Sequence, residues 1–197
     1  MSAPPQDGPV SGVLHAVGAA GPRVYLRHPV AGDADEFVAA VRVSRTLHAH
    51  WTTPPASRAA FLSYLERTTG PAFRAYLVRR RSDDALLGRA NLSQIFHGAL
   101  QSAYLGYEAF APHAGHGYMT EGVGLVLREA FGPVGLHRVE ANIQPDNAAS
   151  KALVRRLGFR LEGFSPKYLL IAGAWRDHER WALLADEHRG GSVRVGA

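Results

Sequence analysis

The sequence contains no cysteine, only two lysines and no long apolar run. Without cysteine, a disulfide framework, a thiolate metal site and a cysteine nucleophile are all excluded. No stretch approaches the ~18 uninterrupted apolar residues of a membrane span. No Lys or Arg precedes Arg23 to form the basic start of a secretory signal. We therefore expect a cytoplasmic protein that does not engage a membrane.

The basic charge is carried almost entirely by arginine. All of the 22 basic residues except Lys151 and Lys167 are arginine, and the net charge is +5. Arginine suits planar anions, so a nucleotide, a phosphate or a partner located on nucleic acid fits this balance. A GC-rich coding sequence produces the same enrichment, so the charge alone identifies no ligand. We expect no direct readout of nucleic acid.

Composition changes near each end of the chain divide it into three parts. Residues 1–22 are rich in Pro, Gly and Ala without a period, and residues 186–197 are polar and glycine-rich. Both are predicted to be flexible tails. Residues 23–185 contain no repeat and no linker, and 46% of the whole chain is apolar, as in ordinary folded proteins. This central part is predicted to be one domain.

The spacing of apolar residues predicts an α/β fold in which amphipathic helices pack on a sheet. Strands are expected at 24–27, 75–80, 86–94, 102–110, 137–143, 159–164 and 179–184, with a further hairpin arm at 168–171. Helices are expected to begin near 33 and 57 and to run over 118–131 and 147–157. Gly158 is expected to end the last of them.

A glycine-rich loop lies between the strand 102–110 and the helix 118–131. A helix N-terminus offers unpaired N–H groups and partial positive charge, which favour phosphate. Gly115 and Gly117 allow a pyrophosphate to approach the backbone closely, and His116 can add a proton-linked charge. Spacing alone leaves phosphate binding and a plain turn equally open, because glycine-rich turns are common.

Two segments around this loop resemble a known superfamily. Residues 107–121 (YEAFAPHAGHGYMTE) and 137–163 (HRVEANIQPDNAASKALVRRLGFRLEG) are similar to the GNAT acetyl-CoA-dependent N-acetyltransferases. Residues 87–107 and 168–178 (YLLIAGAWRDH) resemble its Rim-type subgroup, which acetylates the N-terminal alanine of ribosomal proteins. The resemblance extends over most of the chain.

The resemblance implies a mixed, splayed sheet with acetyl-CoA in the gap between the strand ending near Phe110 and the strand from His137. It implies that pantetheine pairs with the backbone of 108–110, that pyrophosphate takes N–H groups of 115–120, and that Asn147 lies near the thioester. The residues that it assigns to the cofactor are Ala109, Phe110, Gly115, His116, Gly117, Tyr118, Met119, Thr120, Asn147 and Lys151.

Attack of an amine on a thioester requires a base for the ammonium, a donor for the oxyanion and an acid for the departing thiolate. Ser150 is the candidate acid, and its alternative is a helix-surface hydroxyl bonded to its own turn. Many superfamily members place a tyrosine acid where this chain has Val154, which leaves Ser150 as the only acid candidate.

The base is less clearly indicated, because Lys167 stands where Rim-type proteins tend to carry a carboxylate. Glu108 is the best substitute, because a partly buried carboxylate beside the gap is expected to have a raised pKa. Its alternatives are a solvent-facing strand residue, or a water chain in place of a dedicated base. In the glycine loop, Ala114 and Met119 depart from the usual motif, so phosphate binding must rely on backbone amides.

Trp51 and Tyr168 are candidates to line the acceptor slot, and the alternative for Trp51 is a loop aromatic that covers the core. The histidine pairs 48/50 and 113/116 lack an identifiable third ligand, so no metal site is expected.

We therefore expect direct acetyl transfer to a primary amine, most sharply the N-terminal alanine of a ribosomal protein. The alternatives are a small-molecule amine, such as an antibiotic or a polyamine, and a non-catalytic acyl-CoA-binding module. The last is suggested by Ala114, Val154 and Lys167. The chain is expected to be a monomer or a homodimer.

Overall fold

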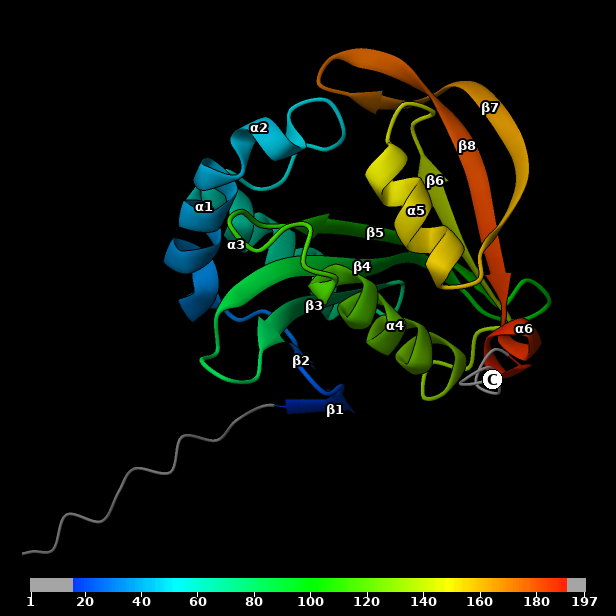
Figure 1. Ribbon diagram of the computed structural model, residues 1–197, viewed down its shortest axis with the longest axis horizontal. Helices are drawn as coiled ribbons and strands as arrows, with labels where there is room; N and C mark the ends of the chain where they lie inside the picture. Colours follow the sequence, from blue (N-terminus) through cyan, green and yellow to red (C-terminus); the bar gives the residue numbers. More distant parts are fainter. Residues whose placement is uncertain (1–15, 191–197) are drawn as a thin grey trace, which may run out of the picture.

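The computed structural model describes the backbone of residues 16–190 and the side chains of residues 19–188. The strands are β1 (Ala16–Ala20), β2 (Val24–Arg27), β3 (Phe73–Arg80), β4 (Leu86–Phe96), β5 (Ser102–Ala109), β6 (Arg138–Ile143), β7 (Arg160–Ile171) and β8 (Ala174–Leu184). The α-helices are α1 (Ala34–Val43), α2 (Arg45–His48), α3 (Arg58–Glu66), α4 (Tyr118–Phe131), α5 (Ala148–Arg156) and α6 (Ala185–Gly190), with short 3₁₀ turns at Ala31–Asp33 and Arg67–Thr69. Figure 1 shows their arrangement.

The eight strands form one sheet in the order β1-β2-β3-β4-β5-β6-β8-β7. Every neighbouring pair is antiparallel except β5 and β6, which run parallel and pair only over Ser102–Tyr104 and Arg138–Glu140. Beyond that short pairing β5 continues to Ala109 and β6 to Ile143, and the two strands diverge (Figure 1). The predicted mixed, splayed α/β sheet is confirmed.

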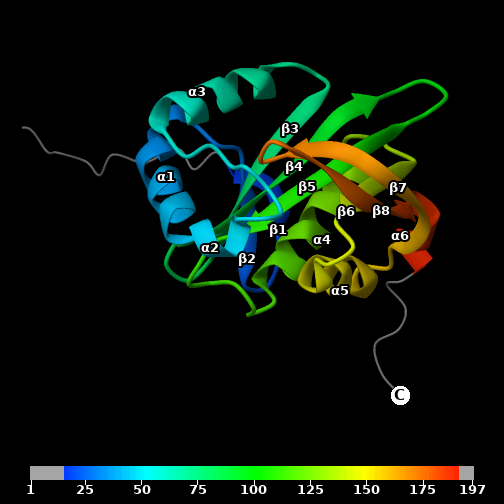
Figure 2. The same cartoon turned by 90° about the horizontal axis from the view of Figure 1, so that it is seen from above.

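Helices cover both faces of the sheet, and the alternation of side chains along each strand supplies both interfaces. On β3, Tyr76 and Val78 belong to the larger core under α4 and α5. Ala75 and Leu77, the alternate residues, belong to a second core under α1 and α3. Figure 2 shows the two helical layers on opposite sides of the sheet. β3 therefore presents one set of side chains to each layer.

The predicted helix over 118–131 is confirmed residue for residue, and Gly158 follows α5 with φ +90°. The predicted strand 159–164 and hairpin arm 168–171 are parts of one strand, β7, interrupted by irregular pairing with β8. Two ordered elements fall where tails were predicted, namely β1 and α6, because β1 pairs with β2 and α6 packs against β8. The rest of those predicted tails, 1–15 and 191–197, lies outside the described residues.

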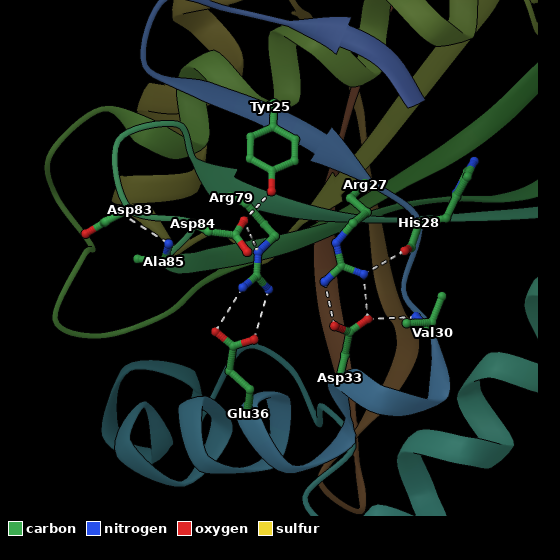
Figure 3. Close-up of polar contacts among 10 residues, drawn as sticks. All are labelled: Tyr25, Arg27, His28, Val30, Asp33, Glu36, Arg79, Asp83, Asp84 and Ala85. Atoms are coloured by element: carbon green, nitrogen blue, oxygen red, sulfur yellow. Dashed lines mark hydrogen bonds and ion pairs between the residues drawn. The ribbon is translucent and has the colours of Figure 1, made fainter. Parts of the chain in front are cut away.

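A buried arginine fastens α1 to the sheet (Figure 3). Arg79 of β3 is nearly buried, and its guanidinium donates to both carboxylate oxygens of Glu36 on α1, at 2.9 and 3.2 Å. Its Nε donates to Asp84 in the β3–β4 turn at 2.7 Å, and the hydroxyl of Tyr25 donates to the same carboxylate. The arginine has a carboxylate on each side, which offsets the desolvation of its charge.

A second ion pair fixes the chain where it enters α1 (Figure 3). Arg27, the last residue of β2, donates to the carboxylate of Asp33 through two nitrogens, at 2.9 and 2.5 Å. The same carboxylate accepts from the backbone N–H of Val30 at 2.7 Å. These contacts set the angle between β2 and α1, and thus the position of the segment that follows α1.

No helix among residues 16–190 is long and apolar enough to cross a membrane.

Replacing Phe37 tests the second core. Phe37 is fully buried on α1, with its ring 4.7 Å from that of Phe61 and 5.4 Å from that of Phe110. Phe37→Ala is expected to lower the free energy of unfolding by about 3–5 kcal/mol, because it removes a large side chain and leaves a cavity. Urea denaturation followed by circular dichroism measures the loss. Val43→Ala on the same helix is the control. Val43 is 69% exposed, so its replacement is expected to change the free energy of unfolding by less than about 0.5 kcal/mol. A loss for Phe37→Ala as small as that for Val43→Ala would contradict the burial of Phe37 in the second core.

Candidate active site

A cleft of about 600 Å³ opens where β5 and β6 separate. Five parts of the chain line it: α2 with the loop after it, β5, the glycine loop with the start of α4, β6, and α5. His178 of β8 also contributes to the wall. The cleft follows from the topology, because the backbone groups of β5 and β6 that no longer pair leave an opening through the sheet.

The glycine loop forms one end of the cleft. Gly115 and Gly117 have φ of +83° and +79°, and a side chain at Gly115 would meet nothing within 4 Å. Gly117 precedes the first turn of α4, where the N–H groups of residues 118–120 have no intrahelical acceptor. Gly115 and Gly117, together with Tyr118, Met119 and Thr120, line the cleft, and their predicted contact with the cofactor stays a prediction. This end can bind an anion through backbone amides.

His116 does not line the cleft, contrary to the prediction. Its ring is exposed and stacks on Tyr118 at 6.1 Å, and its carbonyl accepts from the guanidinium of Arg23 at 3.2 Å. The left-handed glycines on each side turn this residue outward. His113, one turn earlier in the loop, lies in the cleft wall instead.

Two arginines supply positive charge at this end, and sequence reasoning identified neither of them. Arg23 and Arg156 border a smaller hollow together with Gly115, Gly117 and Glu121. Arg23 is positioned by Glu121, which accepts from its backbone N–H at 2.8 Å and from its Nε at 2.9 Å. The sequence signal that could have identified Arg156 was its place at the end of the helix that follows the strand from His137.

Lys151 was predicted to reach phosphate, and the structure places it elsewhere. Its ammonium donates to the carbonyl of Pro145 and to the carboxylate of Glu179 at 3.2 Å. It forms no part of the cleft wall, because it projects from α5 toward β8. Arg156 occupies the position that Lys151 was expected to fill.

Asn147 and Ser150 lie at the start of α5 in the cleft wall. The Asn147 side chain caps the helix by accepting the backbone N–H of Ser150 at 3.0 Å. This cap fixes the first turn of α5, and its orientation brings the Ser150 hydroxyl to 2.6 Å from the hydroxyl of Tyr107. Only the amide nitrogen of Asn147 remains to donate to a ligand.

Tyr107 is a site residue that the sequence reasoning missed. It extends from β5 on the side of the sheet that faces α5, and its hydroxyl also donates to the carbonyl of Ser150 at 3.3 Å. Burial raises the pKa of Tyr107 to about 12, although the hydrogen bond with Ser150 acts in the opposite direction. Tyr107 is therefore protonated at neutral pH, and its one proton can go either to the carbonyl or to the hydroxyl oxygen of Ser150. When Tyr107 donates to the hydroxyl oxygen, the Ser150 proton is free to point into the cleft.

Glu108 lines the cleft, but its environment differs from the prediction. It is 8% exposed, and its carboxylate accepts from two guanidinium nitrogens of Arg89 and from the Thr52 hydroxyl at 2.5 Å. Burial alone would raise the pKa of Glu108, but the charge and hydrogen bonds of Arg89 outweigh it and hold that pKa below its usual range. The expected raised pKa was wrong, because the sequence did not reveal that Arg89 faces Glu108 across β4 and β5.

Phe110 was predicted to offer its backbone to the cofactor, and the structure contradicts this. Its side chain is fully buried in the second core, its N–H donates to the Leu87 carbonyl at 2.8 Å, and its own carbonyl accepts from His113. Ala109 does line the cleft, but its carbonyl accepts from Nε2 of His48 at 2.8 Å. The backbone groups of Phe110 and the carbonyl of Ala109, which were expected to be free for the cofactor, are therefore already hydrogen-bonded within the protein.

Trp51 lines the cleft, and its predicted role in the acceptor slot stays a prediction. The loop that carries Trp51 is tied to the end of β6, because the Gln144 side chain donates to the His50 carbonyl at 2.8 Å. Tyr168 is not itself part of the wall. Its ring packs edge-on against His178 at 6.0 Å, so it lies behind the wall rather than in it.

Two buried polar atoms among the described residues have no hydrogen-bond partner: Nδ1 of His48 and Oδ1 of Asn142. Both residues line the cleft. Buried polar groups are ordinarily satisfied, but both of these atoms are sealed from solvent, so neither faces the open cleft. The glycine backbone and the two arginines fit a ligand with an anionic end. Coenzyme A has such an end.

Comparison with known proteins points to one family. The profile of the "Acetyltransferase (GNAT) domain" matches residues 23–160. A probable N-acetyltransferase of Bacillus subtilis, YjcK, is 34% identical over 172 residues, which cover 83% of this chain and 95% of that protein. The [ribosomal protein uS5]-alanine N-acetyltransferase of Escherichia coli is 40% identical over 98 residues, half of each chain.

Solved structures show the same fold. RimJ of Mycobacterium smegmatis, in complex with CoA-disulfide, superposes with a TM-score of 0.79 at 26% identity, over 88% of this chain and 91% of that one. A spermidine N-acetyltransferase of Vibrio cholerae, in complex with CoA and spermine, gives 0.73 at 21% identity, over 84% and 98%. Identity at this second level shows the fold alone.

Replacing Glu108 tests whether it is a structural ion or a base. Glu108→Gln leaves the charge of Arg89 buried without a partner and is expected to lower the free energy of unfolding by about 3–5 kcal/mol. The folded pKa of Glu108 is depressed, so its contribution is present above about pH 4.3 and lost as pH falls through the lower folded value. The difference between wild type and variant in urea denaturation therefore shrinks below about pH 4.

The double variant Arg89→Met/Glu108→Gln is the matched control, because it removes both charges and is expected to recover most of the lost stability. A Glu108→Gln protein that is as stable as wild type but inactive would instead make Glu108 a catalytic group.

Proposed function

Because this chain belongs to the GNAT acetyltransferase family, we propose that it acetylates the N-terminal α-amine of a protein, with an alanine-starting ribosomal protein as the first acceptor to test. The family and its relatives establish the coarser activity, which is N-acetyl transfer from acetyl-CoA. The acceptor is the proposal. The relative that matches half of the chain at 40% identity acts on the alanine of ribosomal protein uS5. We place the reaction in the cytoplasm, where ribosomal proteins are made.

The charge of the cleft supports this acceptor over a polyamine. Glu108 is the only carboxylate among the described residues of the cleft wall, and it is already neutralised by Arg89. A polyamine carries several ammonium groups, each of which needs a carboxylate or comparable partner when it leaves water. A protein N-terminus carries one, followed by neutral peptide groups. The wall therefore suits a single amine on an otherwise uncharged chain.

The groups proposed to hold acetyl-CoA lie along the α4 and α5 side of the cleft. The amides of the glycine loop and first turn of α4 receive the pyrophosphate, and Arg23 and Arg156 supply compensating charge. The Asn147 amide donates to the pantetheine arm. Acetyl-CoA, when bound, supplies the thioester that the amine attacks and carries away the thiol.

Ser150 is proposed as the donor of a proton to the departing sulfur. Its hydroxyl is 2.6 Å from that of Tyr107, which is protonated at neutral pH and points toward it. When Ser150 gives up its proton, Tyr107 stabilises the oxygen by donating to it. The pair is partly buried on the α5 side of the gap, so in this proposal the proton is delivered from one face of the sheet only.

The acceptor is tested by measuring free thiol released from acetyl-CoA. Alanine-starting peptides from ribosomal proteins are expected to react, and the same peptides with a blocked N-terminus are not. Spermidine and an aminoglycoside are expected to give turnover at least 10-fold slower at equal concentration. Faster turnover of either small amine would contradict the proposed acceptor, and tight coenzyme A binding in calorimetry without turnover of any amine would favour a binding module.

Ser150 and Gly117 are expected to separate the chemical step from cofactor binding. Ser150→Ala should lower kcat by roughly 10²-fold, the scale of a general acid, and leave the Kd for coenzyme A within about 2-fold. Gly117→Val should do the opposite, because Gly117 has a left-handed φ of +79° that a β-branched residue resists, and a larger side chain there enters the proposed anion site. It is expected to weaken coenzyme A by at least roughly 10-fold, or about 1.4 kcal/mol. Calorimetry and steady-state kinetics on both variants measure the split, and Ser150→Ala with wild-type kcat would remove Ser150 from the reaction.

A further inference from the structure

One titratable side chain in the cleft wall has no role in the scheme above. His178 lies on β8, is 2% exposed as a residue and still lines the cleft. Its ring packs against Tyr168 of β7. A buried histidine that reaches a cleft is held in one orientation, so its two ring nitrogens have distinct environments.

The hydrogen bonds of His178 define its tautomer. Nδ1 lies 3.0 Å from the carbonyl oxygen of Arg176, and a carbonyl can only accept, so Nδ1 carries the proton. In the neutral ring, Nε2 then has a free lone pair. No described residue hydrogen-bonds to Nε2 of His178. The buried atoms that lack a partner do not include this nitrogen, so it is accessible to solvent. A proton acceptor is therefore left open where the residue meets the cleft.

The other candidates in the wall are already engaged. Glu108 is saturated by Arg89 and Thr52. His48 donates through Nε2 to the Ala109 carbonyl, which leaves Nδ1 as its acceptor, and Nδ1 is sealed from solvent. His113 lies in the glycine loop at the opposite end of the cleft. His178 is thus the wall residue with an accessible, unshared lone pair at the acceptor end.

The sheet places His178 and Ser150 on opposite sides of the gap. Trp181 and Leu183 of β8 belong to the core under α4 and α5. His178 lies three and five positions earlier, and an odd separation along a regular strand places side chains on opposite faces. The pairing of β8 with β6 is regular from Ile143–Glu179 to Arg138–Leu184. Alternation along it assigns odd-numbered residues 179–183 to the α5 side, and His178 to the side of Glu108 and α1.

We propose that His178 accepts the proton of the incoming amine through Nε2. This inference takes only the class of acceptor, a protein N-terminal amine, from the proposed function. The ammonium loses one proton to Nε2, which releases it to solvent, and the freed nitrogen lone pair forms the new bond to the acetyl carbon. The carbon–sulfur bond breaks and the sulfur takes a proton from Ser150. The nitrogen loses its second proton as the amide forms, and that proton restores Ser150.

The electrostatic setting agrees with this role. Burial lowers the pKa of His178, and the hydrogen bond to Arg176 and the charge of Asp177 oppose that effect only in part. The imidazole is therefore neutral at pH 7 and can accept a proton. The titratable and charged residues that face it or share its side of the neighbouring elements are His48, Tyr104, Glu108, Glu140, Tyr168, Asp177 and Arg180.

The pH dependence of kcat/KM on an alanine-starting peptide tests the proposal. For wild type we expect a bell, with an acid limb below pH 6.5 from His178 and an alkaline limb near 8 from the peptide ammonium. His178→Gln keeps a polar side chain but cannot titrate. It is expected to lose the acid limb, rise monotonically through about pH 8 as free amine forms, and turn over roughly 10²-fold more slowly at pH 7.

His188→Gln is the matched control. His188 also has a pKa lowered by burial and also packs against an aromatic ring, that of Phe131 at 5.3 Å, but it lies on α6 away from the cleft. Its variant is expected to keep the wild-type profile. A His178→Gln profile that retains the acid limb would overturn the proposal, whatever the turnover rate of the variant.

A measurement without turnover separates this proposal from the proposed acceptor. In protein loaded with free coenzyme A, the ring proton of His178 is followed by NMR across pH. Adding the peptide is expected to lower the pKa of His178 further, because an ammonium beside Nε2 disfavours the imidazolium, while His188 stays unchanged. A shift caused by a small amine but not by the peptide would refute the proposed acceptor and retain His178 as the base. No shift with either class of amine would refute the role of His178.

Discussion

The separation of β5 from β6 is the constraint on which the site depends. Backbone pairing between them stops after Tyr104 and Glu140, although both strands continue. A sheet interior ordinarily leaves no room for a ligand, because each strand is 4.7–4.9 Å from the next. Here the unpaired edges open a passage between the two helical layers. A long ligand can then bind on one face while its reactive end meets a partner from the other.

The alternation of side chains along the strands divides the chemistry between the two faces. Tyr107 faces α5 and contacts Ser150, whereas its neighbour Glu108 faces Arg89 and Thr52. The same rule separates His178 from Trp181 on β8. In the mechanism proposed here, a proton is taken from the amine on one side and delivered to the sulfur on the other. A shift of register by one residue would exchange these roles, so the regular pairing of β6 with β8 matters as much as the residues themselves.

The buried Arg89–Glu108 pair gives the cleft its charge balance. It places two charges beside the gap and cancels them, so the acceptor end has a polar wall without a free carboxylate. Arg156 lies at the glycine-loop end, together with Arg23, which is paired with Glu121. The glycine-loop end therefore has an excess of positive charge and the other end a neutral wall, which supports a phosphorylated donor and an acceptor with a single charge in the proposed reaction.

The sequence alone determined most local elements and located the glycine loop. Helix 118–131, the helix starts near 57 and 147, and the glycines before α4 depend on neighbours within a few residues, so their patterns can be read directly. Contacts between distant segments decided the rest. Arg89 lowers the pKa of Glu108 from another strand, Glu179 holds Lys151 away from the cleft, and the Tyr107–Ser150 contact joins residues far apart in the chain. Protonation and orientation depend on such neighbours, and only the folded chain brings them together.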